Sequence, residues 1–560
     1  MKVLFVCYRF NSLAQRLYCE LVERGHEIAV ELDVHPELTV EAVETYKPDL
    51  VLAPFLRRKI PRRVWENVKT LIIHPGVRGD RGPSALDWAI IRGERVWGVT
   101  LLEASEEYDA GDVWAWREFP LRFARKSSIY RQEVTEGAVE CVLEAIEKIE
   151  DGFSPEPQKE GKWNPRMEQS VRRIEWDRDR TADVLRKMYA SDSQPGVLDD
   201  RVFGKEVFLY NAFPEEELKG PPGELIVRRD EAVCVGTVDG ALWITHARER
   251  HKMAIKLPVL RLFPELEKKL PPVEIEPWES VSFATYREIL YEEEEDVAYI
   301  HFNFYNGAMS TEQCERLRKV VGYAKRRPVK AIVLFGQEDF FSNGMNLNTI
   351  EHAKSPPDES WRNINAMDDL CEEILTAYDK LTVAGMQGNA GAGGVFLALT
   401  CDLVFAKSGV VLNPHYKNIG NLYGSEFWTY TLPRRVGWEK GKEVMESRMP
   451  VSSKKAAEIG LIDGYFGKSP SEFRRLLKSR VVGFINSPEF ERFLIRKREE
   501  RTNPEWIKRV KECRERELAH MRLNFYGFDT SYHIARYYFV HRLPHFRTPP
   551  YLAPHRRANT

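Results

Sequence analysis

A histidine at the end of an apolar run is the first residue whose type and place could do chemistry. In "LIIHPGVRGDRGPS", residues 71–84, His74 closes a run typical of a buried strand, and Pro75 and three glycines follow it. Proline keeps the preceding residue extended, and glycines permit turns or the close approach of a ligand. Ligands of open α/β sheets bind beyond the carboxyl ends of the strands. His74 therefore either faces a ligand or is satisfied by its own loop.

A carboxylate farther along the chain offers a group for proton transfer. The segment "EEYDAGDVW" places Asp109 in a loop with Glu106, Glu107 and Asp112. Clustered carboxylates raise one another's pKa, which helps one of them to shuttle a proton near neutrality. The alternative is that Asp109 only caps the turn at "DAG".

Two further segments have the chemistry of ligand sites. The strand "KVLFVCY" runs into "RFNSLAQRL", where a helix is expected to begin near Ser12, with Gln15 in its first turn. A helix amino terminus with Arg9 beside it can bind an anion, although Arg9 also fits an ordinary surface position. Arg131 and Arg542 are weaker candidates for the same role. The second segment, "GNAGAGGVFLALTCDLVFA", residues 388–406, has a glycine-rich turn whose N–H groups can point at a ligand oxygen.

The elements that must position these residues fall into an alternating pattern over residues 1 to about 150. Short apolar runs such as "IAVEL", "DLVLAPF" and "VWGVTLLEA" alternate with helix patterns. This alternation predicts an open, mostly parallel sheet with helices on both faces. Ser84 and Gly93 are the expected start and stop signals of the helix "ALDWAIIR".

The rest of the chain predicts three more parts. Short strands joined by turns such as Asp239-Gly240 predict a small antiparallel β-barrel or sheet, and a proline- and glutamate-rich linker follows it. Further α/β units begin near 296, where Ser310 and Gln313 form a capping box, and charged helices fill the stretch from 470 to 545. The predicted boundaries are 1–180, 181–275, 276–295 and 296–560.

Composition limits the class of protein. The chain has 560 residues, 43% hydrophobic and 30% charged, with a net charge of -2, so no overall field attracts nucleic acid or an anionic membrane. Eight cysteines without a CxxC pair suit a reducing cytoplasm and argue against a structural zinc site, and no metal is expected. No secretory signal or stretch of eighteen apolar residues is found, so a soluble cytoplasmic protein is expected.

The first half resembles a known enzyme family. A histidine-proline loop followed by "GVTLLEASEEYDAGDV" resembles the N10-formyltetrahydrofolate formyltransferase and hydrolase family over residues 1 to about 150. The resemblance implies that His74 and Asp109 carry formyl transfer. It also implies that the folate is lined by Ala53, Pro54, Phe55 and Leu56. The stretch 180–275 looks like the small carboxy-terminal barrel of methionyl-tRNA formyltransferases.

One residue departs from that family. The family has an asparagine two residues before the histidine, and this chain has Ile72 there. Losing an amide that steadies the oxyanion costs about 2.7 to 4 kcal/mol of transition-state stabilisation if nothing replaces it. Either another donor replaces the amide, or the acceptor differs, or this half binds formyl-folate without catalysis.

The second half resembles the crotonase (enoyl-CoA hydratase/isomerase) superfamily. The resemblance covers about 296 to 467 and rests on the glycine-rich turn together with "AIVLFGQEDFFSNGMNL". It implies an acyl-CoA ligand whose carbonyl is polarised by the N–H groups of Met345 and Gly393. The two glutamates that add water in the hydratases align with Phe396 and Tyr416, so water addition to a double bond is not expected.

The loop "NPHYKNIGNLYGSEFW" retains groups that can move protons. Tyr416 and Glu426 fit the roles of acid and base, with His415 next in line. The alternative is that Tyr416 only packs and Glu426 only caps the following helix.

The combination of both halves resembles the HypX/HoxX-type hydrogenase maturation proteins across nearly the full length. The resemblance implies formyl transfer from 10-formyltetrahydrofolate to coenzyme A, followed by decarbonylation of formyl-CoA to carbon monoxide, with other hydrogenase maturation proteins as possible partners. Three alternatives remain: a formyl-folate hydrolase whose second half senses CoA, a formyltransferase acting on an amine, and a maturation scaffold without catalysis.

Overall fold

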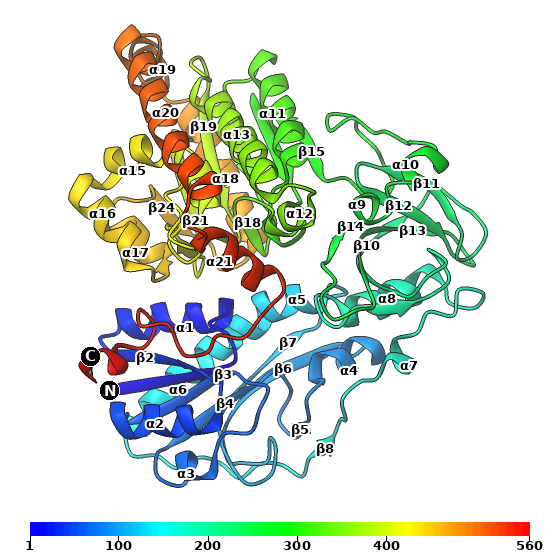
Figure 1. The fold of residues 1–560 in the computed structure, drawn as a ribbon, viewed down its shortest axis with the longest axis vertical. Coiled ribbons are helices and arrows are strands. Elements are labelled where there is room, and N and C mark those ends of the chain that lie inside the picture. The colour runs from blue at the N-terminus through cyan, green and yellow to red at the C-terminus, as the bar shows by residue number, and fades with distance from the viewer. Residues whose placement is uncertain (560) are drawn as a thin grey trace. The chain divides into compact units, whose positions relative to one another are not determined.

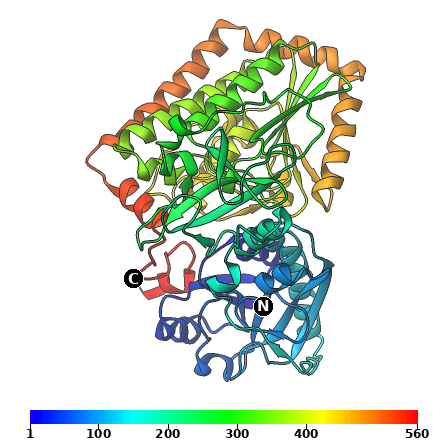
Figure 2. The ribbon, with the colours of Figure 1, turned by 90° about the vertical axis from the view of Figure 1, so that its right-hand side faces the viewer.

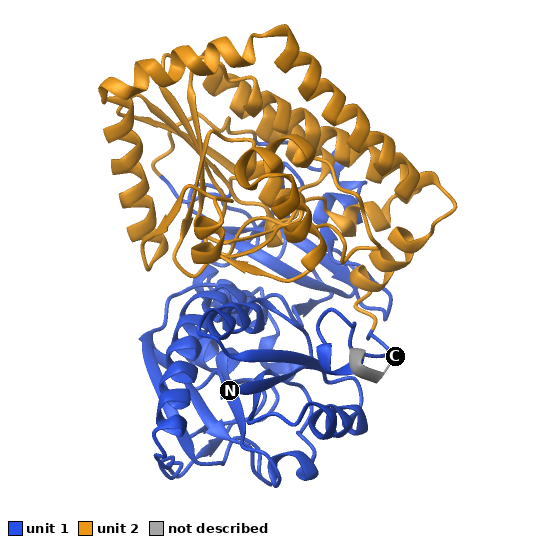
Figure 3. Cartoon of the chain, turned by 90° about the vertical axis from the view of Figure 1, so that its left-hand side faces the viewer, with its two compact units in different colours: residues 1–273, 283–286, 544–560 blue, residues 274–282, 287–543 orange. Residues whose placement is uncertain are grey.

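The chain forms two compact units, which Figure 3 shows in different colours. The computed structural model describes residues 1–559. Unit 1 contains residues 1–273 and 283–286 and the segment from 544 onward, and unit 2 contains residues 274–282 and 287–543. In sequence, unit 2 is therefore an insertion, because the chain returns to unit 1 after residue 543.

The first sheet of unit 1 is open and mostly parallel, as predicted. Its strand order is β2-β1-β3-β4-β6-β7, and only β6 runs antiparallel to its neighbours β4 and β7. Helices cover both faces, with α1 and α6 on one face and α2 on the other (Figure 1). The strands are β1 (Lys2–Cys7), β2 (Glu27–Leu32), β3 (Leu50–Phe55), β4 (Thr70–His74), β6 (Val96–Glu103) and β7 (Val113–Pro120). The helices are α1 (Ser12–Glu23), α2 (Pro36–Tyr46), α4 (Ala85–Arg92) and α6 (Thr135–Glu150).

The second sheet of unit 1 is antiparallel, and of the two expected forms, a small barrel or a sheet, the structure has the open sheet. The order is β11-β12-β13-β10-β9, and β14 pairs with β13. A closed barrel needs its outermost strands to pair, but within the described residues β9, which has only three residues, does not pair with β11. The strands are β9 (Val197–Asp199), β10 (Val207–Glu215), β11 (Leu225–Arg229), β12 (Ala232–Gly236), β13 (Ala241–Glu249) and β14 (Leu257–Pro258).

The last segment of the chain lies on the edge of β2, within unit 1. The N–H of Val30 donates to the carbonyl of Leu552 (2.9 Å), and the buried Glu31 pairs with Arg556 (3.0 Å). Because an uncovered edge strand is a template for wrong pairing, this segment protects β2.

The main sheet of unit 2 has the order β15-β16-β17-β19-β21-β24, and only β15 is antiparallel to its neighbour. Strand β15 lies in the segment expected to be a linker, and it was missed because its exposed end consists of glutamates, which suit an edge strand. The strands are β15 (Ile289–Glu294), β16 (Val297–Phe302), β17 (Ala331–Phe335), β19 (Leu381–Met386), β21 (Leu403–Lys407) and β24 (Gly464–Phe466). A second, small sheet contains β18 (Phe340–Ser342), β20 (Asn389–Gly391), β22 (Val411–Asn413) and β23 (Val451–Ser452).

Long helices surround these sheets, and the predicted capping box at Ser310 and Gln313 begins the first of them. In Figure 2 the helices from α18 to α20 run along the outside of unit 2, and α20 packs against α13 and α15. None of the helices in the described chain is long and apolar enough to cross a membrane. The helices are α11 (Thr311–Arg326), α13 (Pro356–Leu375), α14 (Gly393–Leu399), α15 (Trp428–Val436), α18 (Pro470–Ile485), α19 (Pro488–Arg501), α20 (Pro504–Tyr526) and α21 (Ser531–Val540).

Candidate active sites

The first candidate site lies where β4 ends in unit 1. His74 is the last residue of β4, and Asp109 lies in the loop between β6 and β7. Because β4 and β6 are antiparallel, the loop after β6 leaves at the opposite end of β4 from His74. Asp109 nevertheless reaches the loop after β4, where it accepts the N–H of Gly82, and its Oδ1 lies 3.6 Å from His74 Nδ1. The structure thus brings together the two residues that the sequence singled out.

A second carboxylate, Asp80, holds the other side of the imidazole. His74 Nε2 hydrogen-bonds Asp80 Oδ2 at 2.7 Å, and both side chains are buried, with 5% and 3% of their surface exposed. Burial lowers the pKa of His74, but the hydrogen bond to Asp80 and the charges of Asp109 and Asp80 outweigh it, so the pKa is raised. The imidazole is therefore favoured in its cationic form between two carboxylates.

Two of the glycines in this loop are required by close approach. A Cβ at Gly76 would collide with His74 Nε2 and Asp80 Oδ2. Gly82 has a φ of +117°, its Cβ would collide with the carbonyl of Asn164, and its N–H donates to Asp109 Oδ2 at 3.0 Å. The glycines therefore make room for the hydrogen-bonded pair and fix Asp109, as the sequence suggested for glycines near a ligand.

Sequence reasoning missed Asp80 and Asn164. Asn164 is buried, and its amide donates to Asp80 Oδ1 at 2.6 Å. Ile72, at the position of the family's asparagine, packs against the apolar cluster beside β3 and β4. Asn164 is thus a buried amide beside the His74–Asp80 pair, and it donates to Asp80. The signal for Asp80 was its place inside the glycine loop, six residues after His74.

The candidate anion loop follows β1. Helix α1 begins at Ser12 as expected, but Asn11 is the capping residue, and its side chain accepts the N–H of Ala14 at 3.0 Å. Gln15 donates from Nε2 to the carbonyl of Phe10, which ties the first turn to the loop. Arg9 is exposed. The pKa of His545 is lowered mainly by burial and further by the positive charge of Arg9.

Aromatic contacts join this loop to the predicted folate segment. Phe55 lies edge-on to Tyr8 (6.2 Å between ring centroids) and to Tyr130 (6.3 Å). Ala53 and Pro54 are buried, whereas Phe55 and Leu56 are half-buried. Arg131 follows Tyr130 in a short π-helix, Tyr130–Val134. Through these rings, the residues next to Arg9 and Arg131 contact Phe55 of the predicted folate segment. Arg542 follows α21 in unit 2.

The second candidate site lies in unit 2, where α14 begins. Ala392, just before Gly393, has a φ of +47°, which is strained for a residue with a side chain. The N–H of Met309 donates to the carbonyl of Gly344, and the N–H of Asn346 donates to the carbonyl of Met309. Because its two neighbours make these bonds, the N–H of Met345 points away from Met309. A Cβ at Gly344 would lie 3.2 Å from the amide nitrogen of Gly393. The two backbone segments expected to polarise a carbonyl are therefore adjacent.

Tyr416 and Glu426 lie at the same place. The hydroxyl of Tyr416 donates to Glu426 Oε2 at 2.6 Å, and Phe396 stacks on the Tyr416 ring. The other oxygen, Oε1, lies against Gly393, where a Cβ would collide with it. Burial, with the charge of Asp368 next, raises the pKa of Glu426 to about 8, and burial with the charge of Glu426 raises the pKa of Tyr416. Glu426 can therefore exchange a proton near neutral pH beside the backbone amide of Gly393.

His415 precedes Tyr416 in the sequence, and its side chain is buried. Within the described residues neither of its ring nitrogens has a hydrogen-bond partner. Burial, with the charge of Arg448 second, lowers its pKa to about 4, so the ring is neutral at physiological pH.

Comparison with known proteins agrees with this two-site arrangement. The formyl transferase family matches residues 18–146, the formyl transferase C-terminal domain matches 166–260, and the enoyl-CoA hydratase/isomerase family matches 292–473. Fold and sites together define a protein that joins a formyltransferase module to a crotonase-type module.

Full-length relatives identify the family. The hydrogenase maturation factor HoxX of Bradyrhizobium diazoefficiens is 44% identical over 99% of this chain and 97% of its own length. The crystal structure of HypX from Aquifex aeolicus in complex with tetrahydrofolic acid is 73% identical, with a TM-score of 0.98 over 100% of this chain and 99% of that one. This chain belongs to the HoxX/HypX family of hydrogenase maturation factors.

Proposed function

We propose that this chain transfers formyl from 10-formyltetrahydrofolate to coenzyme A and then splits formyl-CoA into carbon monoxide and free CoA. The observation that carries the proposal is the presence, in one chain, of a His74–Asp109 formyltransferase-type site and a Tyr416–Glu426 pair against Gly393. Formyl is the acyl group that both modules can handle. The carbon monoxide would serve hydrogenase maturation in the cytoplasm, where another maturation protein would receive it.

In the first step, the thiol sulfur of CoA attacks the formyl carbon of the folate. His74, with its raised pKa, supplies positive charge near the oxygen that becomes negative. Asp109 takes the thiol proton and delivers it to N10 as the folate leaves. Asp80 keeps His74 in its cationic form, which offsets in part the absence of an amide at Ile72.

In the second step, the N–H groups of Met345 and Gly393 polarise the formyl carbonyl, and Glu426 Oε1 takes the formyl hydrogen as a proton. The C–S bond breaks with its electron pair moving to sulfur, while the pair of the C–H bond remains on carbon as carbon monoxide forms. Glu426 then gives the proton to the sulfur, so no oxidant or reductant is consumed. Tyr416 orients the carboxyl through Oε2.

The cofactors follow the same division. Tetrahydrofolate would lie along Ala53–Leu56, and the complex of the Aquifex aeolicus protein with tetrahydrofolic acid supports folate as a ligand. The phosphates of CoA would contact Arg9, Gln15 and Arg131 of unit 1, and Arg542 of unit 2 is a weaker candidate. The Aquifex aeolicus protein has also been solved as an R9A-Q15A-R131A-R542A variant, and this chain has the same residue types at those numbers.

The test is to incubate the protein with 10-formyltetrahydrofolate and CoA and to measure carbon monoxide in the gas phase together with formate. Carbon monoxide supports the proposal, whereas formate alone indicates a hydrolase and no turnover indicates a scaffold. His74→Ala or Asp109→Asn should abolish consumption of formyl-folate and leave CoA binding intact.

Variants of the second site separate the two steps. Tyr416→Phe and Glu426→Gln should each stop release of carbon monoxide while formyl still leaves the folate. Tyr465→Phe, an exposed tyrosine of the same unit, is the matched control and should behave as wild type. Release of carbon monoxide at the wild-type rate from either site variant would remove that residue from the proton path and make His415 the next candidate.

A further inference from the structure

The turn that carries Glu426 has an uncommon backbone. Glu426 and Phe427 are consecutive non-glycine residues with φ values of +58° and +57°. Left-handed conformations of this kind cost roughly 1–2 kcal/mol per residue and persist only where the surroundings enforce them. Something must therefore hold residues 425–429 in place.

Two carboxylates from distant parts of the chain hold this turn. Asp368 of α13 accepts the N–H of Glu426 at 2.8 Å. Glu517 of α20 accepts the N–H of Phe427 at 2.9 Å and both the N–H and the hydroxyl of Thr429, at 2.7 and 2.6 Å. Glu517 thereby caps the amino terminus of α15, where a negative charge is favoured. Both carboxylates are fully buried.

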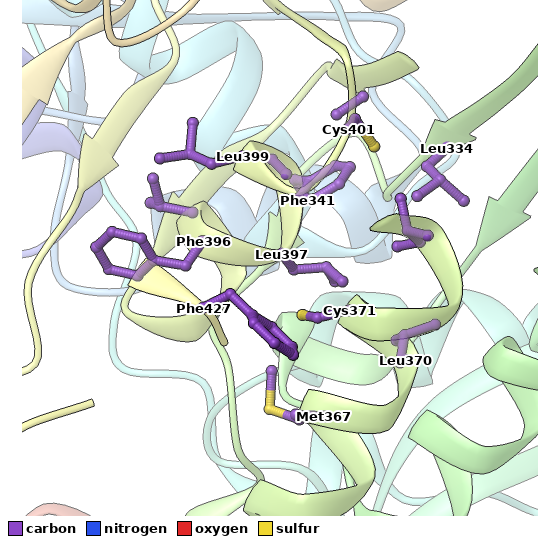
Figure 4. Close-up of a cluster of buried hydrophobic side chains, with 14 of the residues drawn as sticks. Leu334, Phe341, Met367, Leu370, Cys371, Phe396, Leu397, Leu399, Cys401 and Phe427 are labelled. Carbon is purple, nitrogen blue, oxygen red and sulfur yellow. The ribbon is translucent and has the colours of Figure 1, made fainter. Parts of the chain in front are cut away.

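Ser425 links the two carboxylates. Its hydroxyl donates to Asp368 Oδ2 at 2.7 Å and lies 3.4 Å from Glu517 Oε2, and its N–H donates to Glu426 Oε2 at 3.1 Å. The side chain of Phe427 then points into the apolar core beside Met367 of α13 (Figure 4). The turn is thus fixed by polar contacts on one side and by packing on the other.

We propose that Asp368 and Glu517 are positioning residues that present the Glu426 carboxyl to Gly393, a role that rests on the proposed decarbonylase function. Glu517 belongs to α20, which lies beyond the segment 292–473 that matches the enoyl-CoA hydratase/isomerase family. The carboxy-terminal helices are therefore part of the second active site and not only a solvated extension.

The same residues set the charge state of Glu426. We call Asp368, Glu426 and Glu517 the carboxyl cluster. Burial is the main reason that the pKa of each of these carboxyls is raised. The charge of a neighbouring carboxylate, in the cluster or adjacent to it, raises the pKa further. Like charges in a dry site cannot all ionise, so the cluster keeps protons at neutral pH. Other titratable or charged groups around it include Tyr416, Cys314 on α11, Cys371 and Asp369 on α13, and Arg514 on α20, which lies 3.9 Å from Asp368.

The first measurement is release of carbon monoxide by Glu517→Gln. The amide keeps the size of the side chain, but its NH₂ group faces an N–H donor of the turn, so at least about a tenfold loss of carbon monoxide release is expected, with formyl still leaving the folate. Glu515→Gln, an exposed glutamate on the same helix, is the control and should keep the wild-type rate. Should Glu517→Gln fail to fold, Thr429→Ala removes one donor to Glu517 and should show a smaller loss in the same step.

The second measurement does not depend on carbon monoxide. The infrared C=O band of the protonated Glu426 carboxyl, assigned by its loss in Glu426→Gln, should disappear in the wild type with a midpoint near the pKa of about 8. Asp368→Asn removes the neighbouring charge and should move this midpoint to lower pH. If the wild type releases no carbon monoxide but the midpoint moves, the proposed function fails and the positioning role stands. A Glu517→Gln variant with the wild-type rate, or an unmoved midpoint in Asp368→Asn, overturns the positioning role.

Discussion

Replacing Asp80 by asparagine tests the first site most directly. The His74–Asp80 pair is a buried hydrogen bond of 2.7 Å between a carboxylate and an imidazole whose pKa is raised. Hydrogen bonds to charged groups contribute about 1.5–3 kcal/mol. The Asp80→Asn substitution would keep the shape of the side chain but remove its charge, so His74 should lose its proton at lower pH than in the wild type.

The expected effect is a loss of about 10- to 150-fold in kcat/KM for formyl-folate, since each 1.36 kcal/mol corresponds to a factor of ten. The loss should be largest at alkaline pH, and the alkaline limb of the pH–rate profile should move to lower pH. The raised pKa also stabilises the folded state: this contribution is complete below the unfolded pKa of about 6.5 and is lost as pH rises through the folded pKa.

The assay is consumption of 10-formyltetrahydrofolate in the presence of CoA over a range from slightly acidic to alkaline pH. Asp112→Asn, the same substitution at an exposed aspartate near Asp109, should leave both rate and profile unchanged. If Asp80→Asn has the wild-type rate and the same alkaline limb, Asp80 does not tune His74, and the imidazole is set by Asp109 alone.

Three further predictions follow from the geometry. Gly76→Ala should reduce formyl-folate consumption at least about tenfold because its Cβ would push His74 away from Asp80, whereas Gly483→Ala, which has open space around it, should be neutral in the same assay. Arg9→Ala should weaken CoA binding and flatten its dependence on ionic strength in a titration, and an unchanged salt dependence would remove Arg9 from the site. The carboxyl cluster binds protons more tightly in the folded chain, so the melting temperature of unit 2 should fall as pH rises from acidic to alkaline values, and a melting temperature independent of pH would contradict the raised pKa values.

Features written in local sequence could be predicted. Strand β4 ending at His74, helix α4 stopping at Gly93 in the left-handed conformation, and the capping box of α11 all depend on residues within a few positions of one another. The pairing of His74 with Asp109 came from a family resemblance, and in the structure the glycine loop after β4 holds Asp109 through the N–H of Gly82.

Features that depend on distant packing could not be predicted. Glu517 lies in "RERELAH", where nothing separates it from the exposed glutamates of the same helix until α20 packs against α13 and α15. In the sequence Asp80 looks like a turn residue of a glycine loop, and only the folded structure shows its hydrogen bond to His74. Whether the antiparallel sheet closes depends on pairing between its outermost strands, β9 and β11, which turn patterns do not reveal.

The return of the chain to the edge of β2 has a consequence for synthesis on the ribosome. Residues 1–273 of unit 1 emerge before unit 2, but the partners of Val30 and Glu31 emerge only after all of unit 2. Until then β2 has an open edge and Glu31 is an unpaired carboxylate, a state that costs about 3–5 kcal/mol once such a charge is buried. Unit 1 should therefore remain incompletely folded during translation. It should complete its fold last, when Arg556 pairs with Glu31.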